Sequence, residues 1–189
     1  IKNFTHKIQY KQIDKVNIGN GLAYTKSFFG EPNAIKRSQT NPDVEFYYYI
    51  KDKFIFTIIT SDKRVNGYSV LSRITDFSPE VPFSAPLGKS TILDEASGEF
   101  EYSFDTGNLI YYLESQNLGK DKMFLSLSKG FIEYAAIPSS INSPDNYLAS
   151  VKIALNEIDS LLIYSDTNKD LEKEINSLRG KIKPNYYAV

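Results

Sequence analysis

Two neighbouring runs of aromatic and β-branched residues constrain the fold of this 189-residue chain more than any other feature. The runs cover residues 44–50 and 54–60, and only Lys51-Asp52-Lys53 separates them. Residues of these types favour strands, and so short a separation joins antiparallel neighbours. The sequence therefore predicts a hairpin, followed by a turn over residues 61–67 and a third strand over residues 67–74. Asn66-Gly67 is the expected turn signal.

Short helical patterns precede the hairpin. Residues 3–16 place three lysines four residues apart, at Lys7, Lys11 and Lys15, which is typical of a short helix with a solvated basic side. Residues 22–29 form a second short helical pattern that ends at Gly30, with Pro32 just beyond. A glycine after the last helical residue and a proline beyond it are the expected stop signals.

The C-terminal part has a different period. Ser143-Pro144 matches a helix N-cap followed by proline at the first helical position. Apolar residues then recur every three or four positions in two stripes: Leu148, Val151, Leu155, Ile158 and Leu162, and then Leu171, Ile175, Leu178 and Ile182. The region 143–183 is therefore predicted as two helices with a break at residues 165–168. Each stripe covers about two heptads, too few for a free coiled coil, so we expect packing on the protein's own sheet. A partner helix is the alternative.

The first half of the chain has a weaker echo in the second. Lys-Asp-Lys recurs at residues 120–122, residues 110–113 resemble residues 47–50, and residues 131–135 stand where the third strand of the first unit stood. We interpret this as a degenerate duplication. The expected organisation is a first unit at 1–76, a proline-containing linker at 77–86, a second unit at 87–138 and the helical pair at 143–183. The predicted class is α+β: two degenerate repeats of short helices plus antiparallel sheet, with a C-terminal helical pair.

Composition removes several function classes. The chain has no Cys, one His and a formal net charge of −1. Disulfides, thiol nucleophiles, Cys-ligated metals and any site that needs two histidines are excluded. A dedicated nucleic-acid binder is usually strongly basic, so no nucleic acid is expected as a partner. The longest nearly apolar run, residues 54–59, is too short to cross a bilayer.

Three short motifs point to chemistry but fail on detail. Gly88-Lys-Ser-Thr91 resembles the end of a phosphate-binding loop, yet Phe83 stands where the first glycine is needed, so we interpret Gly88 as the turn that opens a helix. Residues 166–170 begin like a calcium loop, but Leu171 and Ser177 replace the required Gly and Glu, so helix capping is expected. His6 has no catalytic partner that spacing identifies. No cofactor, metal or catalytic residue is predicted.

Exposed tyrosines and an acidic run are the candidate binding features. Consecutive strand residues point to opposite faces, so Tyr48 is expected on the face away from Tyr47 and Tyr49, and Tyr111 is expected opposite Tyr112. Five acids and no base lie between Thr91 and Asp105, whereas residues 1–37 hold seven Lys/Arg against two acids. Tyr48, Tyr111, Glu99, Glu101 and Asp105 are therefore the predicted protein-binding residues, with the tyrosines on one concave sheet surface and the acids at its rim. The alternatives are buried tyrosines between helices, and a solvated acidic face.

The pairs Ile18-Gly19 and Phe29-Gly30 followed by Pro32, ahead of an aromatic hairpin, resemble a repeating αβ module. The module is similar to the unit of the small lipoproteins of the outer-membrane barrel-assembly machinery and of the β-lactamase inhibitor proteins, which carry two such units in tandem. The match covers residues 12–75 and recurs after Leu87. The sequence departs from it at Asn20-Gly21, where Met-Thr is usual in the lipoproteins, and in the helical C-terminal part. The chain also resembles uncharacterised bacterial ectodomains that follow a single membrane anchor.

This resemblance implies a non-enzymatic protein-binding or scaffolding domain at the cell envelope, anchored by a segment outside these residues. A cytoplasmic inhibitor or immunity-type protein, which would cover a partner's basic site with its acidic surface, is the alternative. An enzyme with a carboxylate-only site is a third hypothesis. Another protein is the expected partner, and the sequence leaves its identity and the oligomeric state open. The basic N-terminal cluster favours the cytoplasmic side of a membrane.

Overall fold

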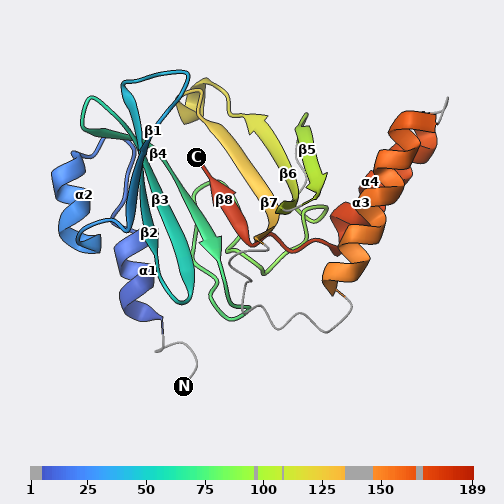
Figure 1. Ribbon diagram of the computed structural model, residues 1–189, viewed down its shortest axis with the longest axis horizontal. Helices are drawn as coiled ribbons and strands as arrows, with labels where there is room; N and C mark the ends of the chain where they lie inside the picture. Colours follow the sequence, from blue (N-terminus) through green and yellow to red (C-terminus); the bar gives the residue numbers. More distant parts are fainter. Residues whose placement is uncertain (1–5, 96–97, 108, 135–146, 165–167) are drawn as a thin grey trace.

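The computed structural model describes residues 6–95, 98–107, 109–134, 147–164 and 168–189. Eight strands form one antiparallel sheet in the order β1-β2-β3-β4-β8-β7-β6-β5 (Figure 1). The strands are β1 (Ala34–Arg37), β2 (Val44–Ile50), β3 (Phe54–Ser61), β4 (Arg64–Ser72), β5 (Glu101–Thr106), β6 (Leu109–Asn117), β7 (Ser126–Tyr134) and β8 (Tyr186–Ala188). The described helices are α1 (Lys7–Ile13), α2 (Leu22–Phe29), α3 (Tyr147–Tyr164) and α4 (Asn168–Lys181), with the short 3-10 helix η2 (Lys120–Lys122). The predicted α+β class is confirmed.

The C-terminal strand β8 joins the two halves of the sheet. Strands β1–β4 form one meander and β5–β7 another, and β8 pairs with β4 on one side and β7 on the other. Gly67 lies beside this junction, where an added Cβ would come within 2.5 Å of the Val189 carbonyl oxygen. Gly67 therefore permits the C-terminus to approach β4, because any side chain would meet this backbone.

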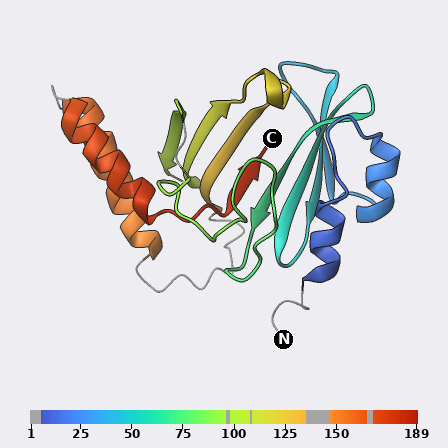
Figure 2. The same cartoon turned by 180° about the vertical axis from the view of Figure 1, so that it is seen from behind.

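All four α-helices pack on the same face of the sheet. The first core cluster joins Ile13, which ends α1, and Phe29 of α2 to Phe56 of β3, and the second joins Val151 of α3 and Leu178 of α4 to Tyr112 of β6. The register places Phe56 and Tyr112 on one face, which we call the outer face. The two helix pairs stand at opposite ends of the molecule, and the sheet bends between its two halves so that both pairs lie on the outside of the bend (Figures 1 and 2). The other face of the sheet, which we call the inner face, lies on the inside of the bend.

The first hairpin has the predicted form, but its second turn differs. Strand β2 covers residues 44–50 as predicted, whereas β4 begins at Arg64 instead of residue 67. Asp62 and Lys63 form the turn with φ of 51° and 60°, so Asn66-Gly67 lies inside the strand. The predicted turn position was wrong because Gly67 serves the contact with the C-terminus and not a chain reversal.

The second unit departs from the predicted repeat in detail. Strand β7 covers residues 126–134 and so begins before residue 131, where the counterpart of the third strand was predicted, and the Lys-Asp-Lys at 120–122 forms η2. In the described part of residues 87–134, η2 is the only helical segment. The segment 77–86, predicted as a linker, packs on the outer face: Phe77 and Val81 are buried, and the Pro82 carbonyl accepts a hydrogen bond of 2.8 Å from the Tyr187 hydroxyl. The duplication itself stays a prediction.

The C-terminal helices pack on the protein's own sheet, as predicted. Val151, Leu155 and Ile158 of α3, with Ile175 and Leu178 of α4, are buried against Tyr112 and Phe131. Leu162, assigned to the same stripe, is 49% exposed near the end of α3. None of the described helices combines the length and hydropathy that crossing a membrane requires.

Candidate functional site

The described α-helices pack on the outer face of the sheet and leave the inner face without a helix. One row of residues crosses all eight strands on this face in register: Ala34, Tyr48, Thr57, Ser69, Ala188, Ser128, Ser115 and Glu101. Small side chains occupy the five central positions of this row, from Thr57 to Ser115. A larger side chain from another molecule could therefore approach the backbone here.

Serine and threonine side chains form the centre of this row. Thr57 and Ser69 are cross-strand neighbours and are each 8% exposed. Ser115 and Ser128 bond to one another with 2.6 Å between their Oγ atoms. The centre of the row therefore offers short hydroxyl side chains, which can both donate and accept hydrogen bonds, to a ligand.

Tyr48 lies at the β2 end of this row. It is half-buried, and the Lys36 ammonium lies 5.8 Å from the centre of its ring. Its neighbours in sequence point to the outer face, where Tyr47 is 7% exposed and Tyr49 is fully buried. The predicted alternation is confirmed.

Tyr111 lies on the same inner face, at the other end of the sheet. Its cross-strand neighbours are Asp105 on β5 and Ile132 on β7, and it is half-buried. Tyr112 points to the outer face and is fully buried. Four strands, β3, β4, β8 and β7, separate Tyr111 from Tyr48, so the two tyrosines share a face but not a contact.

The predicted acidic residues gather at the β5 edge. Glu101 and Asp105 are exposed on the inner face of this edge strand, and Asp105 Oδ1 accepts a hydrogen bond from the Gly107 amide. Glu99 precedes β5 and lines, with Phe100 and Glu101, a hollow of about 310 Å³. The structure thus places the three acids near the Tyr111 end, whereas Lys36 lies beside Tyr48. The inner face is negative at one end and carries a positive charge at the other.

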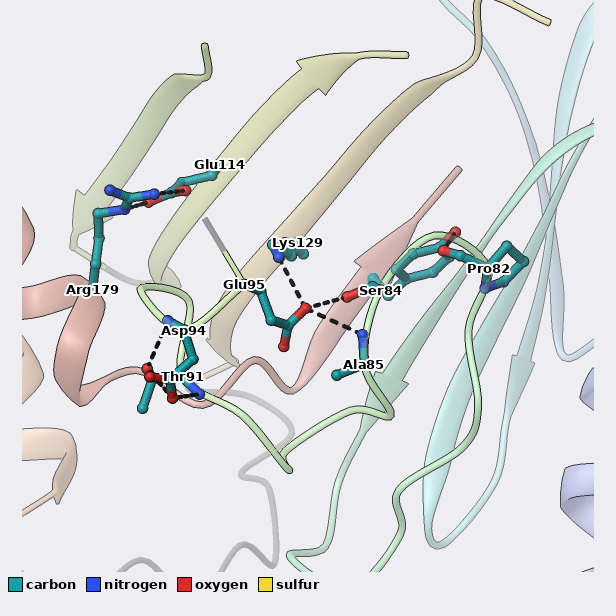
Figure 3. A network of polar contacts seen from close by, with 10 residues as sticks. Pro82, Ser84, Ala85, Thr91, Asp94, Glu95, Glu114, Lys129 and Arg179 are labelled. Atoms are coloured by element: carbon teal, nitrogen blue, oxygen red, sulfur yellow. Dashed lines mark hydrogen bonds and ion pairs between the residues drawn. The ribbon is translucent and has the colours of Figure 1, made fainter. Parts of the chain in front are cut away.

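The other two acids of the run, Asp94 and Glu95, accept hydrogen bonds from neighbouring residues. Glu95 Oε2 accepts hydrogen bonds from Lys129 Nζ at 3.0 Å, Ser84 Oγ at 2.6 Å and the Ala85 amide at 3.2 Å (Figure 3). Asp94 pairs with Thr91, and these hydrogen bonds lower the pKa of the Asp94 carboxyl. Glu95 therefore attaches the loop before β5 to β7 of the sheet, whereas Asp94 stabilises a turn within that loop.

A second buried ion pair joins α4 to β6. Arg179 Nε donates to Glu114 Oε1 at 2.7 Å (Figure 3). The Tyr112 hydroxyl donates to the same oxygen at 2.8 Å. Burial and the neighbouring Glu114 carboxylate raise the pKa of the Tyr112 hydroxyl. Sequence reasoning missed Glu114, Lys129 and Arg179, because their pairing spans 34 and 65 residues of chain.

The weaker motifs have structural roles. Gly88 has a φ of 74° in a turn, and residues 87–95 contain no described helix, so the predicted helix after Gly88 was wrong. The calcium-like segment 166–170 lies partly outside the described residues. His6 is buried between Tyr10 and Phe77, with the Lys53 ammonium 3.1 Å from Nδ1 and Asp76 Oδ2 3.4 Å from Nε2. In the described part of the chain, no three His, Asp or Glu side chains are placed to hold a metal ion.

The comparisons with known proteins add no relative. No protein family, curated protein or solved structure matches this chain.

Proposed function

We propose that this protein is a non-catalytic binding or scaffolding domain whose protein partner docks on the inner face of the sheet. The uncovered inner face carries the proposal. The four α-helices pack on the outer face, while the inner face presents Tyr48, Tyr111 and the hydroxyl side chains of Thr57 and Ser69. Tyrosine supplies large contact area at low cost in side-chain entropy, and hydroxyl groups can donate hydrogen bonds to a partner or accept them from it.

The resemblance to tandem αβ modules supports a place for this domain at the bacterial cell envelope, behind a membrane anchor. Protease treatment of intact cells and of cells with a permeabilised outer membrane tests this location. The domain is expected to be cleaved only when the protease reaches the envelope, while a cytoplasmic marker stays intact. Protection of both proteins would contradict an envelope location.

Photo-crosslinking in the native host tests the docking face. A benzophenone amino acid replaces Tyr48 or Tyr111, and the control replaces Tyr24, which is 53% exposed on α2. We expect a discrete crosslinked protein from both inner-face positions and not from position 24. The same products from all three positions, or none from the inner face, would contradict the proposal.

The acidic edge favours a second candidate, an inhibitor or immunity-type protein that covers a basic site. Glu101 and Asp105 are exposed on an edge strand beside Tyr111, where they can meet basic groups of a partner. Replacing both residues by Lys is then expected to abolish the crosslink from position 111. A crosslink that survives this charge reversal would contradict the inhibitor hypothesis and leave the docking proposal standing.

A further inference from the structure

Helix α3 presents apolar residues on two sides. Val151, Leu155 and Ile158 are fully buried in the second core cluster. Ile153 and Tyr164 lie on the side away from the core and are 60% and 83% exposed. They are eleven residues, about three turns, apart and therefore share one side of the helix. A helix that is apolar on two sides usually has a partner on each.

The outward side of α3 forms one wall of a groove against α4. The groove has a volume of about 590 Å³. Ile153, Ser160 and Leu161 line it from α3, at the helical spacing that a second helix packed alongside would meet. Ser160 is a small residue, and its hydroxyl donates a hydrogen bond of 2.8 Å to the Asn156 carbonyl of the same helix. The Ser160 side chain is therefore held against α3 and leaves room in the groove.

Acidic residues dominate the polar walls of the groove. Glu157 of α3 with Asp170 and Glu174 of α4 line it, against one base, Lys173. A groove with apolar positions and an acidic rim complements a helix that has an apolar stripe flanked by Lys or Arg.

We propose that this groove binds an amphipathic, basic helix of a partner protein, which would complete a three-helix bundle with α3 and α4. This binding is independent of docking on the inner face. A second copy of the chain fits less well, because a symmetric contact through this groove brings its acids against the same acids. Anionic lipid fits less well for the same reason.

The test measures binding of the chain to a dye-labelled synthetic helical peptide with a leucine stripe and flanking lysines, by fluorescence anisotropy. A matched peptide carries Glu in place of Lys. The lysine peptide is expected to bind at least about tenfold tighter, and to bind more weakly as salt rises. Binding of the two peptides within about twofold of each other would overturn the proposal.

Paired variants locate the peptide on the chain. Ile153→Ser is expected to weaken binding by about fivefold or more, whereas Ile8→Ser, at an isoleucine of α1 that is 72% exposed, leaves binding unchanged. Glu174→Lys is expected to weaken binding, whereas Glu172→Lys, on α4 outside the groove lining, has a smaller effect. Equal effects within either pair would overturn the proposal.

Three further measurements distinguish the peptide from other occupants of the groove. The first uses the wild-type chain and therefore does not depend on whether a variant folds. Amide chemical-shift changes in the wild-type chain are expected on α3 and α4, and changes confined to the inner face would overturn the proposal while supporting inner-face docking. Sedimentation that shows a dimer dispersed by Ile153→Ser would assign the groove to a second copy. Binding to phosphatidylcholine vesicles that Ile153→Ser abolishes would assign it to lipid.

Discussion

The buried pair of Glu114 and Arg179 allows a quantitative test of how the C-terminal helices are attached to the sheet. The two side chains are 6% and 7% exposed, and Arg179 donates from both Nε and Nη2 to the carboxylate. The guanidinium also lies 4.1 Å from the centre of the Phe100 ring. Arg179→Met replaces the guanidinium side chain by an unbranched apolar one, which leaves Glu114 buried without a cation.

The expected loss in the free energy of unfolding is about 3–5 kcal/mol, the range for removing one partner of a buried ion pair. Replacing the carboxylate as well, as Glu114→Leu, removes the uncompensated charge but leaves the buried Tyr112 hydroxyl without its acceptor, at about 1–3 kcal/mol. The triple variant Tyr112→Phe, Glu114→Leu, Arg179→Met removes both charges of the ion pair and the Tyr112 hydroxyl that bonds to it. It is therefore expected to recover most of the loss.

Urea unfolding followed by circular dichroism measures these changes. With a slope of about 2 kcal/mol per molar urea, Arg179→Met is expected to lower the midpoint by about 1.5–2.5 M. The control is Arg37→Met, because Arg37 is 75% exposed and pairs with Glu45 at the surface. Its loss is expected to stay below about 1 kcal/mol. Equal losses in the two variants, or a triple variant no more stable than Arg179→Met, would refute the reasoning.

Two further predictions concern the sheet. Gly130→Ala is expected to lower the free energy of unfolding, measured in urea, by more than about 2 kcal/mol, because the added Cβ would overlap the Tyr112 carbonyl oxygen. The control is Gly119→Ala, which has open space around the added Cβ and is expected to lose far less. Burial raises the pKa of Tyr47, Tyr49 and Tyr68 to about 12. The stability that this shift supplies is complete below about pH 10, the unfolded value, and is lost as pH rises toward 12. Melting temperatures across this range, with Tyr49→Phe showing a smaller loss, test this effect, and no fall above pH 10 would contradict it.

Local patterns predicted most of the individual elements. Strand β2 and helix α2 have the predicted bounds, since residues 44–50 are aromatic or β-branched at nearly every position and Gly30 stops the helix after residue 29. The facing of Tyr48 and Tyr111 was also predictable, because alternation is a property of any strand. The binding role of these tyrosines and of the acidic residues stays a prediction.

Contacts between distant residues could not be predicted in the same way. Strand β8 has three residues, Tyr186–Ala188, and it exists because β4 and β7 offer hydrogen-bonding edges on both of its sides. No local sequence pattern shows that Gly67 lies against the backbone of the C-terminus and not in a turn. The row from Tyr48 to Glu101 depends on this strand, because β8 supplies Ala188 at its centre.

The sequence by itself determined the class of fold, the position of most strands and helices, and which tyrosines share a face, because these follow from periodicity and turn chemistry within a few residues. Only the tertiary structure decided that the two meanders form one bent sheet, that the four α-helices cover its outer face, and that Thr57 and Ser69 lie side by side on the inner one. The physical reason is that strand pairing and buried ion pairs join residues far apart in the sequence, such as Ser69 and Ala188, which are more than a hundred positions apart. Their free energy depends on which surfaces meet, and no local pattern encodes that.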